Sequence, residues 1–232
     1  MFIFTLFNFW TWTALQDNQP ELYIPVYRNI EGWNISIDPM LFHEPNLNIY
    51  QKAQTALANH LQRVKFILPL ERIRELQQLP IRLEWDNPRL TNMQYHPDQS
   101  WLITHGHDPS LANHVHIPQA ASLYDPHMWA KHPYVILHEL AHAYHDQFLR
   151  FDHPEILAVY RAAKLRGDYE KVLLYTGTTV RHYGLTDHKE YFAEATEAYW
   201  GVNDFYPFVR AELKEHDPAM YQLLEKIWGP VP

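Results

Sequence analysis

The stretch Val135-Ile-Leu-His-Glu-Leu-Ala-His-Ala-Tyr-His145 contains the pattern His-Glu-x-x-His at His138, Glu139 and His142. Positions four apart lie one turn apart on one face of an α-helix, so two imidazoles at this spacing can bind one metal ion. Glu139 follows the first histidine and can reach a water molecule on that ion. This spacing is the one that zinc-dependent hydrolysis requires.

The residues around this pattern favour a metal over a purely structural role. Between Tyr134 and Tyr144 there is no proline or glycine, and Glu139 is the only acidic or basic residue besides the histidines. Apolar side chains cover the rest of the helix, so we expect it to be buried nearly all round. Buried carboxylates and imidazoles need partners, because unpaired buried polar groups are costly. A zinc ion supplies that partner, and the alternative is a core helix whose histidines are satisfied by hydrogen bonds.

Composition narrows the possible partners and ligands. The chain has 232 residues, of which 47% are hydrophobic, which is enough for one domain or two closely packed lobes. A net charge of −8 without a basic run argues against nucleic acid as a partner. Since there is no cysteine, disulfides and thiolate zinc sites are excluded. Any metal must therefore be held by His, Asp or Glu.

The N-terminal stretch, residues 2–15, is apolar and aromatic but is interrupted by threonines and an asparagine, and no Lys or Arg precedes it. A signal peptide has a basic start and a smoother apolar segment. The stretch is also too short and too polar to span a bilayer. We expect a structured or docking segment, no transmembrane segment and a cytoplasmic location, with an atypical export signal over residues 1–15 as the alternative.

The order of the expected elements indicates an α+β architecture, because strands come first and helices follow. We expect a single domain over residues 1–232, with an N-terminal lobe (1–132) that holds a small mixed sheet and a mainly helical lobe (133–232) that carries the zinc-binding helices. The aromatic-rich loop 203–208 is expected to join two helices rather than to wall a cleft. The expected strands are 26–30 and 33–37, which form a hairpin, 81–85, 101–104 and 114–117; the expected helices are 48–68, 69–80, 154–166, 169–175, 188–200, 208–216 and 218–228.

A third metal ligand must come from outside this helix. Catalytic zinc usually has three protein ligands, and in one class the third is a histidine ten positions after the first, but Phe148 occupies that position here. Glu190 and Glu194 lie four apart in the expected helix 188–200, within an apolar surface that calls for a metal or a hydrogen-bonded partner. We assign Glu190 as the ligand and Glu194 as the residue that orients a ligand histidine through its free ring N–H. The reverse assignment, Glu197 as a weaker candidate, and a solvated acidic face stay open.

The run Tyr183-Gly-Leu-Thr-Asp-His-Lys-Glu-Tyr-Phe-Ala-Glu-Ala195, together with the His-Glu-x-x-His pattern, resembles the catalytic domain of anthrax lethal factor and its relatives, which include Mlc-titration-factor-type peptidases. These proteins are gluzincins, and the resemblance covers about residues 134–199. It implies a zincin fold, a Zn²⁺ cofactor on His138, His142 and Glu190, and a transition-state role for Tyr183. Residues 1–83 match nothing in lethal factor, so the substrate preference is not carried over.

The resulting functional prediction is a zinc-dependent endopeptidase in which Glu139 is the general base and Tyr183 donates a hydrogen bond to the oxyanion. By the resemblance, we expect a peptide or protein substrate to bind as an extended strand along the sheet edge at residues 114–118. His145 and His182 could contact the oxyanion or the metal's outer shell, although structural roles are commoner for such histidines. The alternatives are a zincin-fold regulatory or binding protein with little proteolysis, and a metallohydrolase that acts on a non-peptide amide.

Overall fold

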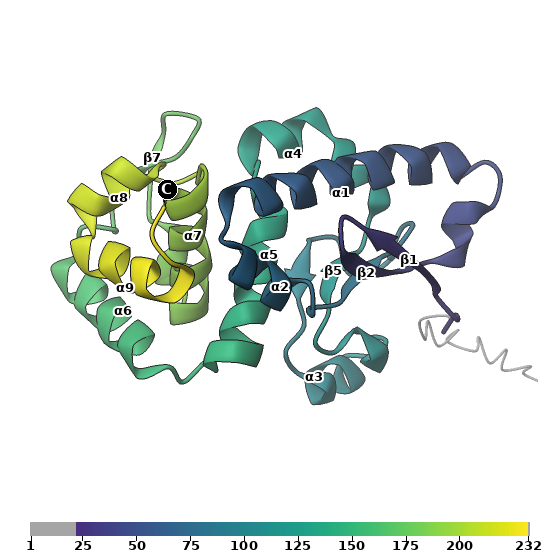
Figure 1. Ribbon diagram of the computed structural model, residues 1–232, viewed down its shortest axis with the longest axis horizontal. Helices are drawn as coiled ribbons and strands as arrows, with labels where there is room; N and C mark the ends of the chain where they lie inside the picture. Colours follow the sequence, from purple (N-terminus) through teal and green to yellow (C-terminus); the bar gives the residue numbers. More distant parts are fainter. Residues whose placement is uncertain (1–21, 232) are drawn as a thin grey trace, which may run out of the picture.

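A five-stranded mixed sheet occupies the N-terminal half of the chain, and helices make up most of the remainder (Figure 1). The computed structural model describes residues 22–231, so the expectations for residues 1–15 lie outside the described residues. The predicted α+β class with a small mixed sheet is confirmed. In spatial order the strands are β1 (Val26–Ile30), β2 (Trp33–Ile37), β3 (Ile81–Leu83), β5 (Val115–Ile117) and β4 (Gln94–Tyr95).

The three central strands β2, β3 and β5 run parallel, and β1 and β4 pair antiparallel at the two edges. The prediction that residues 114–118 form the sheet edge is therefore wrong, because β4 covers β5 on its outer side. A two-residue strand such as β4 is too short to show hydrophobic periodicity, so it could not be predicted from the sequence. The hydroxyl of Tyr95 in β4 donates to Asp146 at 2.7 Å, which ties this edge strand to the end of the motif helix.

Helices of the N-terminal half pack beside the sheet. The longest, α1, buries Ala53, Leu57, Leu61 and Val64, a spacing of three or four that gives one apolar face. The expected strand at residues 101–104 is wrong: it is a helix, because the Asp98 carboxylate caps its first turn. The helices of this half are α1 (Leu47–Ile67), α2 (Leu70–Leu76), α3 (Gln99–Thr104) and α4 (Pro126–Lys131).

The C-terminal half is helical apart from one short hairpin. The predicted helix at residues 169–175 is wrong, since Val172–Leu173 (β6) pairs with Thr179–Val180 (β7) across a turn that uses Gly177 at a φ of 84°. None of the helices within residues 22–231 has both the length and the apolar composition needed to cross a membrane. The helices of this half are α5 (Val135–Tyr144), which continues into a π-helical turn at His145–Leu149, α6 (Pro154–Arg166), α7 (His188–Trp200), α8 (Arg210–His216) and α9 (Pro218–Trp228).

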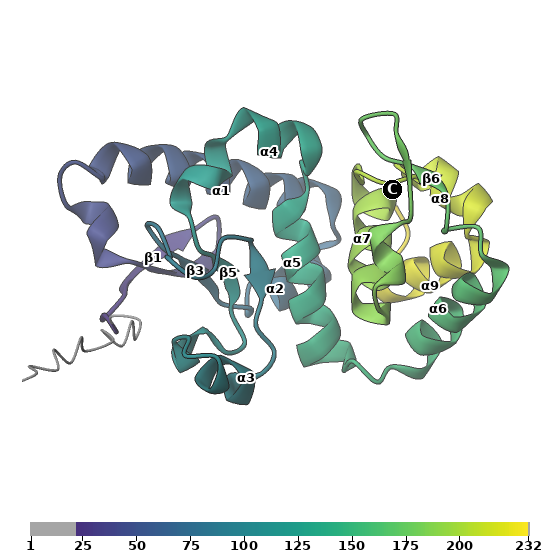
Figure 2. The ribbon, with the colours of Figure 1, turned by 180° about the vertical axis from the view of Figure 1, so that it is seen from behind.

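Helices α5 and α7 lie side by side between the sheet on one side and helices α6, α8 and α9 on the other, as both views show (Figure 1, Figure 2). Every residue of α5 is buried, as the sequence predicted, and so is every residue of α7 from Tyr191 to Trp200. Polar side chains on their facing sides are thus held far from bulk water, and they must satisfy one another or a bound ligand.

Asp217 is the fully buried anchor of the C-terminal helices. Its carboxylate accepts hydrogen bonds from Tyr169 at 3.2 Å and from Tyr191, and it pairs with Arg166 at 3.0 Å. It also caps the first turn of α9 by accepting from the backbone N–H of Met220 at 3.3 Å. One carboxylate therefore joins α6, α7 and α9.

Replacing this carboxylate should destabilise the fold. Asp217→Asn keeps the volume but removes the charge that pairs with Arg166 and one of the two acceptor oxygens, so we expect the free energy of unfolding to fall by about 2–4 kcal/mol. Urea denaturation followed by circular dichroism measures the change. Asp152→Asn is the matched control, because Asp152 pairs with Arg150 at 3.7 Å and both side chains are 82% exposed. An equal loss in both variants would contradict the anchoring role of Asp217.

Candidate metal centre

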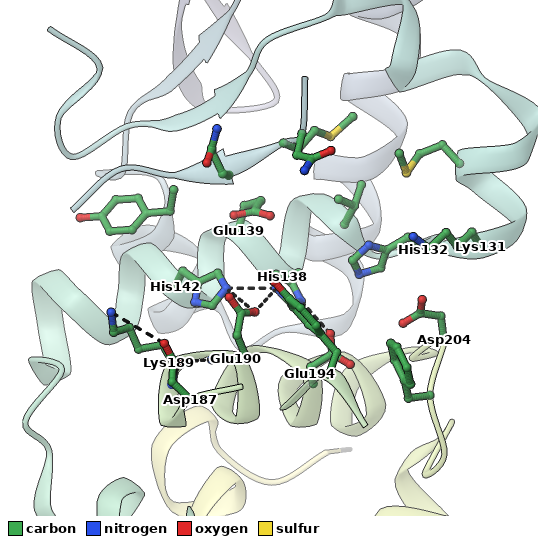
Figure 3. A pocket seen from close by; sticks show the side chains of 18 of the residues that line it. Lys131, His132, His138, Glu139, His142, Asp187, Lys189, Glu190, Glu194 and Asp204 are labelled. Carbon is green, nitrogen blue, oxygen red and sulfur yellow. Dashed lines mark hydrogen bonds and ion pairs between the residues drawn. The ribbon is translucent and has the colours of Figure 1, made fainter. Parts of the chain in front are cut away.

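The motif helix α5 presents His138 and His142 to α7, where Glu190 meets them (Figure 3). Glu190 lies in the first turn of α7, which Asp187 caps by accepting from the backbone N–H groups of Lys189 and Glu190 at 2.8 and 3.0 Å. A carboxylate at this end of a helix is favoured by the helix dipole. The helix start thus fixes the position of the third donor.

Three donor atoms converge at this point. His138 Nε2 and His142 Nε2 are 3.0 Å apart, and each is 3.2 Å from Oε2 of Glu190. In a tetrahedron with zinc–ligand bonds of about 2.0–2.1 Å, ligand atoms are separated by roughly 3.3–3.4 Å. The observed triangle is close to one face of that tetrahedron, so the geometry fits zinc.

The hydrogen bond on the side of His138 that faces away from the three donors fixes which ring nitrogen carries the proton in the neutral imidazole. Nδ1 of His138 donates to Oε1 of Glu197 at 2.6 Å, and Nε2 of His132 donates to the same oxygen at 2.8 Å. In its neutral form, His138 keeps the proton on Nδ1 and directs the lone pair of Nε2 toward His142 and Glu190, whereas without a cation Nε2 takes up a proton and donates to Glu190. Lone pairs that converge in this way call for a cation, and a carboxylate behind a ligand histidine is the usual support of a zinc site.

The pKa shifts of His138 and Glu190 also indicate a cation between the three donor atoms. Burial opposes a charged His138, yet its hydrogen bonds to Glu190 and Glu197 raise its pKa well above the ordinary value. Burial likewise opposes a charged Glu190, yet hydrogen bonds from His138 and His142 lower its pKa. The cluster therefore favours a positive charge between the donor atoms.

The two fully buried acids of α7 differ in their partners. Glu197 keeps a pKa of about 2 despite its burial, because the charge and hydrogen bonds of His132 and His138 favour its ionised form. Burial raises the pKa of Glu194 to about 8. Its Oε1 is 3.7 Å from His138 Nδ1, while Glu197 makes the hydrogen bond. The orienting carboxylate predicted as Glu194 is therefore Glu197, and Glu194 lies beside it.

His132 was not identified from the sequence, and Glu197 was expected only as a weaker candidate than Glu190 and Glu194. The three acids follow the i, i+4, i+7 spacing of one helix face, so their spacing marks all three but gives no basis for ranking them. Only the rotation of α7 against α5 decides which carboxylate meets Nδ1. His132 precedes Pro133 in a short loop, and its spacing from the motif carries no signal.

Glu139 and Tyr183 both line the pocket that holds the three donors. Figure 3 shows Glu139 above the donors. Burial raises the pKa of Glu139, so this carboxylate is poised to hold a proton. Tyr183 is 47% exposed and begins a short 3₁₀ turn, Tyr183–Leu185. Burial of part of its side chain and the nearby negative charge of Glu190 raise the pKa of its phenol, which keeps the hydroxyl protonated.

His145 and His182 take structural positions, away from the pocket lining. His182 caps the 3₁₀ turn by accepting from the N–H of Gly184 at 2.9 Å, and so it positions Tyr183 indirectly. His145 is fully buried and packs edge-on against the rings of Phe151 and His188. Burial lowers the pKa of each to about 3, which keeps both neutral. The structure thus brings neither of them to the donor triangle.

The pocket itself has a volume of about 590 Å³ and opens along the edge strand β4. Gln94 and Tyr95 of β4 line it together with Glu139 of α5 and Glu190 of α7. Phe205 also lines it, so the loop 203–208 does wall a cleft, contrary to expectation. The carboxylate of Glu139, the phenol of Tyr183 and the three-donor cluster thus line one cavity beside a sheet edge.

Fold and site together define an α+β protein with a partly buried cluster of two histidines and one carboxylate that could hold a metal ion. No family model, no curated protein and no solved structure matches the chain. The chemistry of the site is therefore argued from its own residues.

Removing the carboxylate donor should release metal. We expect the wild-type protein to bind one zinc ion per chain and Glu190→Ala to bind much less than one at equal free zinc, since two imidazoles alone hold the ion weakly. Plasma mass spectrometry after dialysis measures the ratio. Glu225→Ala, an exposed position on α9, is the control and should keep its zinc. Full zinc retention in Glu190→Ala would show that another residue is the third ligand.

A second pair of variants separates the two buried acids of α7. Glu197→Gln should weaken zinc affinity about 10- to 100-fold, because it replaces the charged acceptor of His138 by a neutral amide. Glu194→Gln should weaken it less, since its carboxylate is 3.7 Å from the same nitrogen. Competition with a fluorescent zinc chelator measures both affinities. The reverse order would return the orienting role to Glu194.

Proposed function

We propose that this protein is a zinc-dependent peptidase of the gluzincin type with a zincin fold. The observation that carries the proposal is the convergence of His138, His142 and Glu190 in a pocket that Glu139 and Tyr183 also line. The resemblance of residues 134–199 to lethal-factor-like gluzincins supports the same five roles. The residues fit a tetrahedral ion with one position left open toward the pocket.

Each residue would have a distinct part in hydrolysis. When bound, zinc supplies Lewis acidity, which lowers the pKa of water toward neutrality and polarises a carbonyl group. Glu139 accepts the proton of the attacking water and later delivers it to the leaving amine, and its raised pKa suits this exchange. Tyr183 remains protonated and donates a hydrogen bond to the developing oxyanion.

The position of β4 suggests how a peptide would be held. It is the last strand on its side of the sheet within residues 22–231, and both of its residues line the pocket. An extended peptide could add to this edge by main-chain hydrogen bonds and present its carbonyl groups to the donor cluster. A pocket that runs beside a sheet edge favours a peptide over a small non-peptide amide.

Replacing the general base tests the proposal. Glu139→Gln should retain one zinc ion per chain and lose activity by a factor of about 10²–10⁴, because the amide cannot accept the proton. Cleavage of a diverse peptide library, read by mass spectrometry, measures the activity of both proteins. Lack of zinc in the wild-type protein would exclude a metallohydrolase of any kind. Zinc without cleavage of any peptide would favour a regulatory protein or a hydrolase of non-peptide amides.

A further inference from the structure

Two buried carboxyl groups at one end of the pocket each have one oxygen atom without a hydrogen-bond partner. Glu194 is 2% exposed and Asp204 is 4% exposed, and both line the pocket beside the metal centre (Figure 3). Within residues 22–231, Oε2 of Glu194 and Oδ1 of Asp204 accept no hydrogen bond. Buried acceptors are almost always paired, so these two atoms need an explanation.

The backbone around these acids is held firmly in place. The side-chain amide of Asn203 donates to the carbonyl of Glu194 at 2.7 Å and accepts from the N–H of Phe205 at 2.7 Å. The N–H of Tyr175 donates to the carbonyl of Asp204 at 2.7 Å. The loop is thus fixed to α7 on one side and to the β6–β7 hairpin on the other. These hydrogen bonds hold the backbone of Asp204 in the position from which its side chain lines the pocket.

The hydrogen-bond donors nearby are used elsewhere. The ring N–H groups of His132 and His138 are both committed to Oε1 of Glu197, and Oε1 of Glu194 is 3.7 Å from Nδ1 of His138. Lys131 also lines the pocket, but its side chain is exposed, and no ion pair between described residues joins it to Asp204. This end of the pocket therefore presents buried carboxyl oxygens that lack a hydrogen-bond donor.

We propose that Glu194 and Asp204 form an acidic subsite that binds a cationic nitrogen of the substrate close to the scissile bond. The nitrogen is that of a lysine or arginine side chain or of a free N-terminus. Leu174 and Phe205 line the same pocket and provide apolar surface for the aliphatic stem of such a side chain. A second metal ion fits less well, because His132 and His138 already donate to Glu197 and leave only oxygens. This inference rests on the proposed function.

The experiment compares peptides that differ only in one cationic group. A neutral scaffold carries lysine or norleucine at each position in turn, with a free or an acetylated N-terminus. Zinc-loaded wild-type protein provides kcat/KM values, and zinc-loaded Glu139→Gln provides Kd values by fluorescence anisotropy. We expect one lysine position, or the free N-terminus, to improve both values by about 10- to 100-fold, as for a charge-assisted hydrogen bond in a buried site.

Variants assign this preference to the subsite. Asp204→Asn should reduce the lysine-to-norleucine ratio about tenfold or more, whereas Asp204→Glu should retain most of it. Glu71→Gln removes the same charge at a residue whose side chain is 76% exposed and should keep the full ratio. The position that responds, side chain or N-terminus, identifies the source of the cation.

The outcomes distinguish this inference from the proposed function. Cleavage with equal ratios in the wild type and in Asp204→Asn would overturn the subsite and leave the peptidase intact. Binding that depends on both the cation and Asp204, without cleavage, would support the subsite and overturn the peptidase. Two zinc ions per wild-type chain and one in Asp204→Asn would overturn the subsite in favour of a second metal site.

Discussion

The packing of α5 against α7 is the constraint on which the rest of this structure depends. Helix α5 and most of α7 are buried, so the polar groups on their facing sides are largely removed from water, and the desolvation is compensated only if the groups meet in the right register. That register places His138 and His142 of one helix against Glu190 of the other. Sheet, edge strand and C-terminal helices are arranged around this contact.

Desolvation also explains why the carboxyl groups of Glu194 and Glu197 differ in pKa. Glu197 accepts two ring N–H groups and stays ionised, which holds the proton of His138 on Nδ1 and frees Nε2. Glu194, one turn nearer the start of α7, lacks such partners, and burial raises its pKa. Two glutamates three residues apart on one helix thus differ because the neighbouring element supplies imidazoles to only one of them.

Long helices with clear end signals could be predicted from the sequence, and short elements could not. The helices 154–166, 188–200 and 218–228 agree with prediction residue for residue, because Pro154 and Pro218 occupy first-turn positions and Asp187 is a cap. Strand β4 has two residues, and α3 has six, so neither shows a period that could be distinguished from chance. Their state is set by tertiary contacts such as that between Tyr95 and Asp146.

The same limit applies to the site. Spacing within one helix fixes which side chains share a face, and this placed His138 and His142 together. Glu190 of α7 was assigned from its apolar surroundings and the resemblance to gluzincins, and the structure brings it to the two histidines. Spacing says nothing about the rotation of one helix against another, which is why Glu194, and not Glu197, was expected to meet Nδ1 of His138. It also says nothing about loops: Asp204 reaches the pocket only because Asn203 and Tyr175 fix its backbone. Under the proposed function, the residues that cleave the bond can thus be identified from local sequence motifs, whereas the residues that select the substrate are identified only from the tertiary structure.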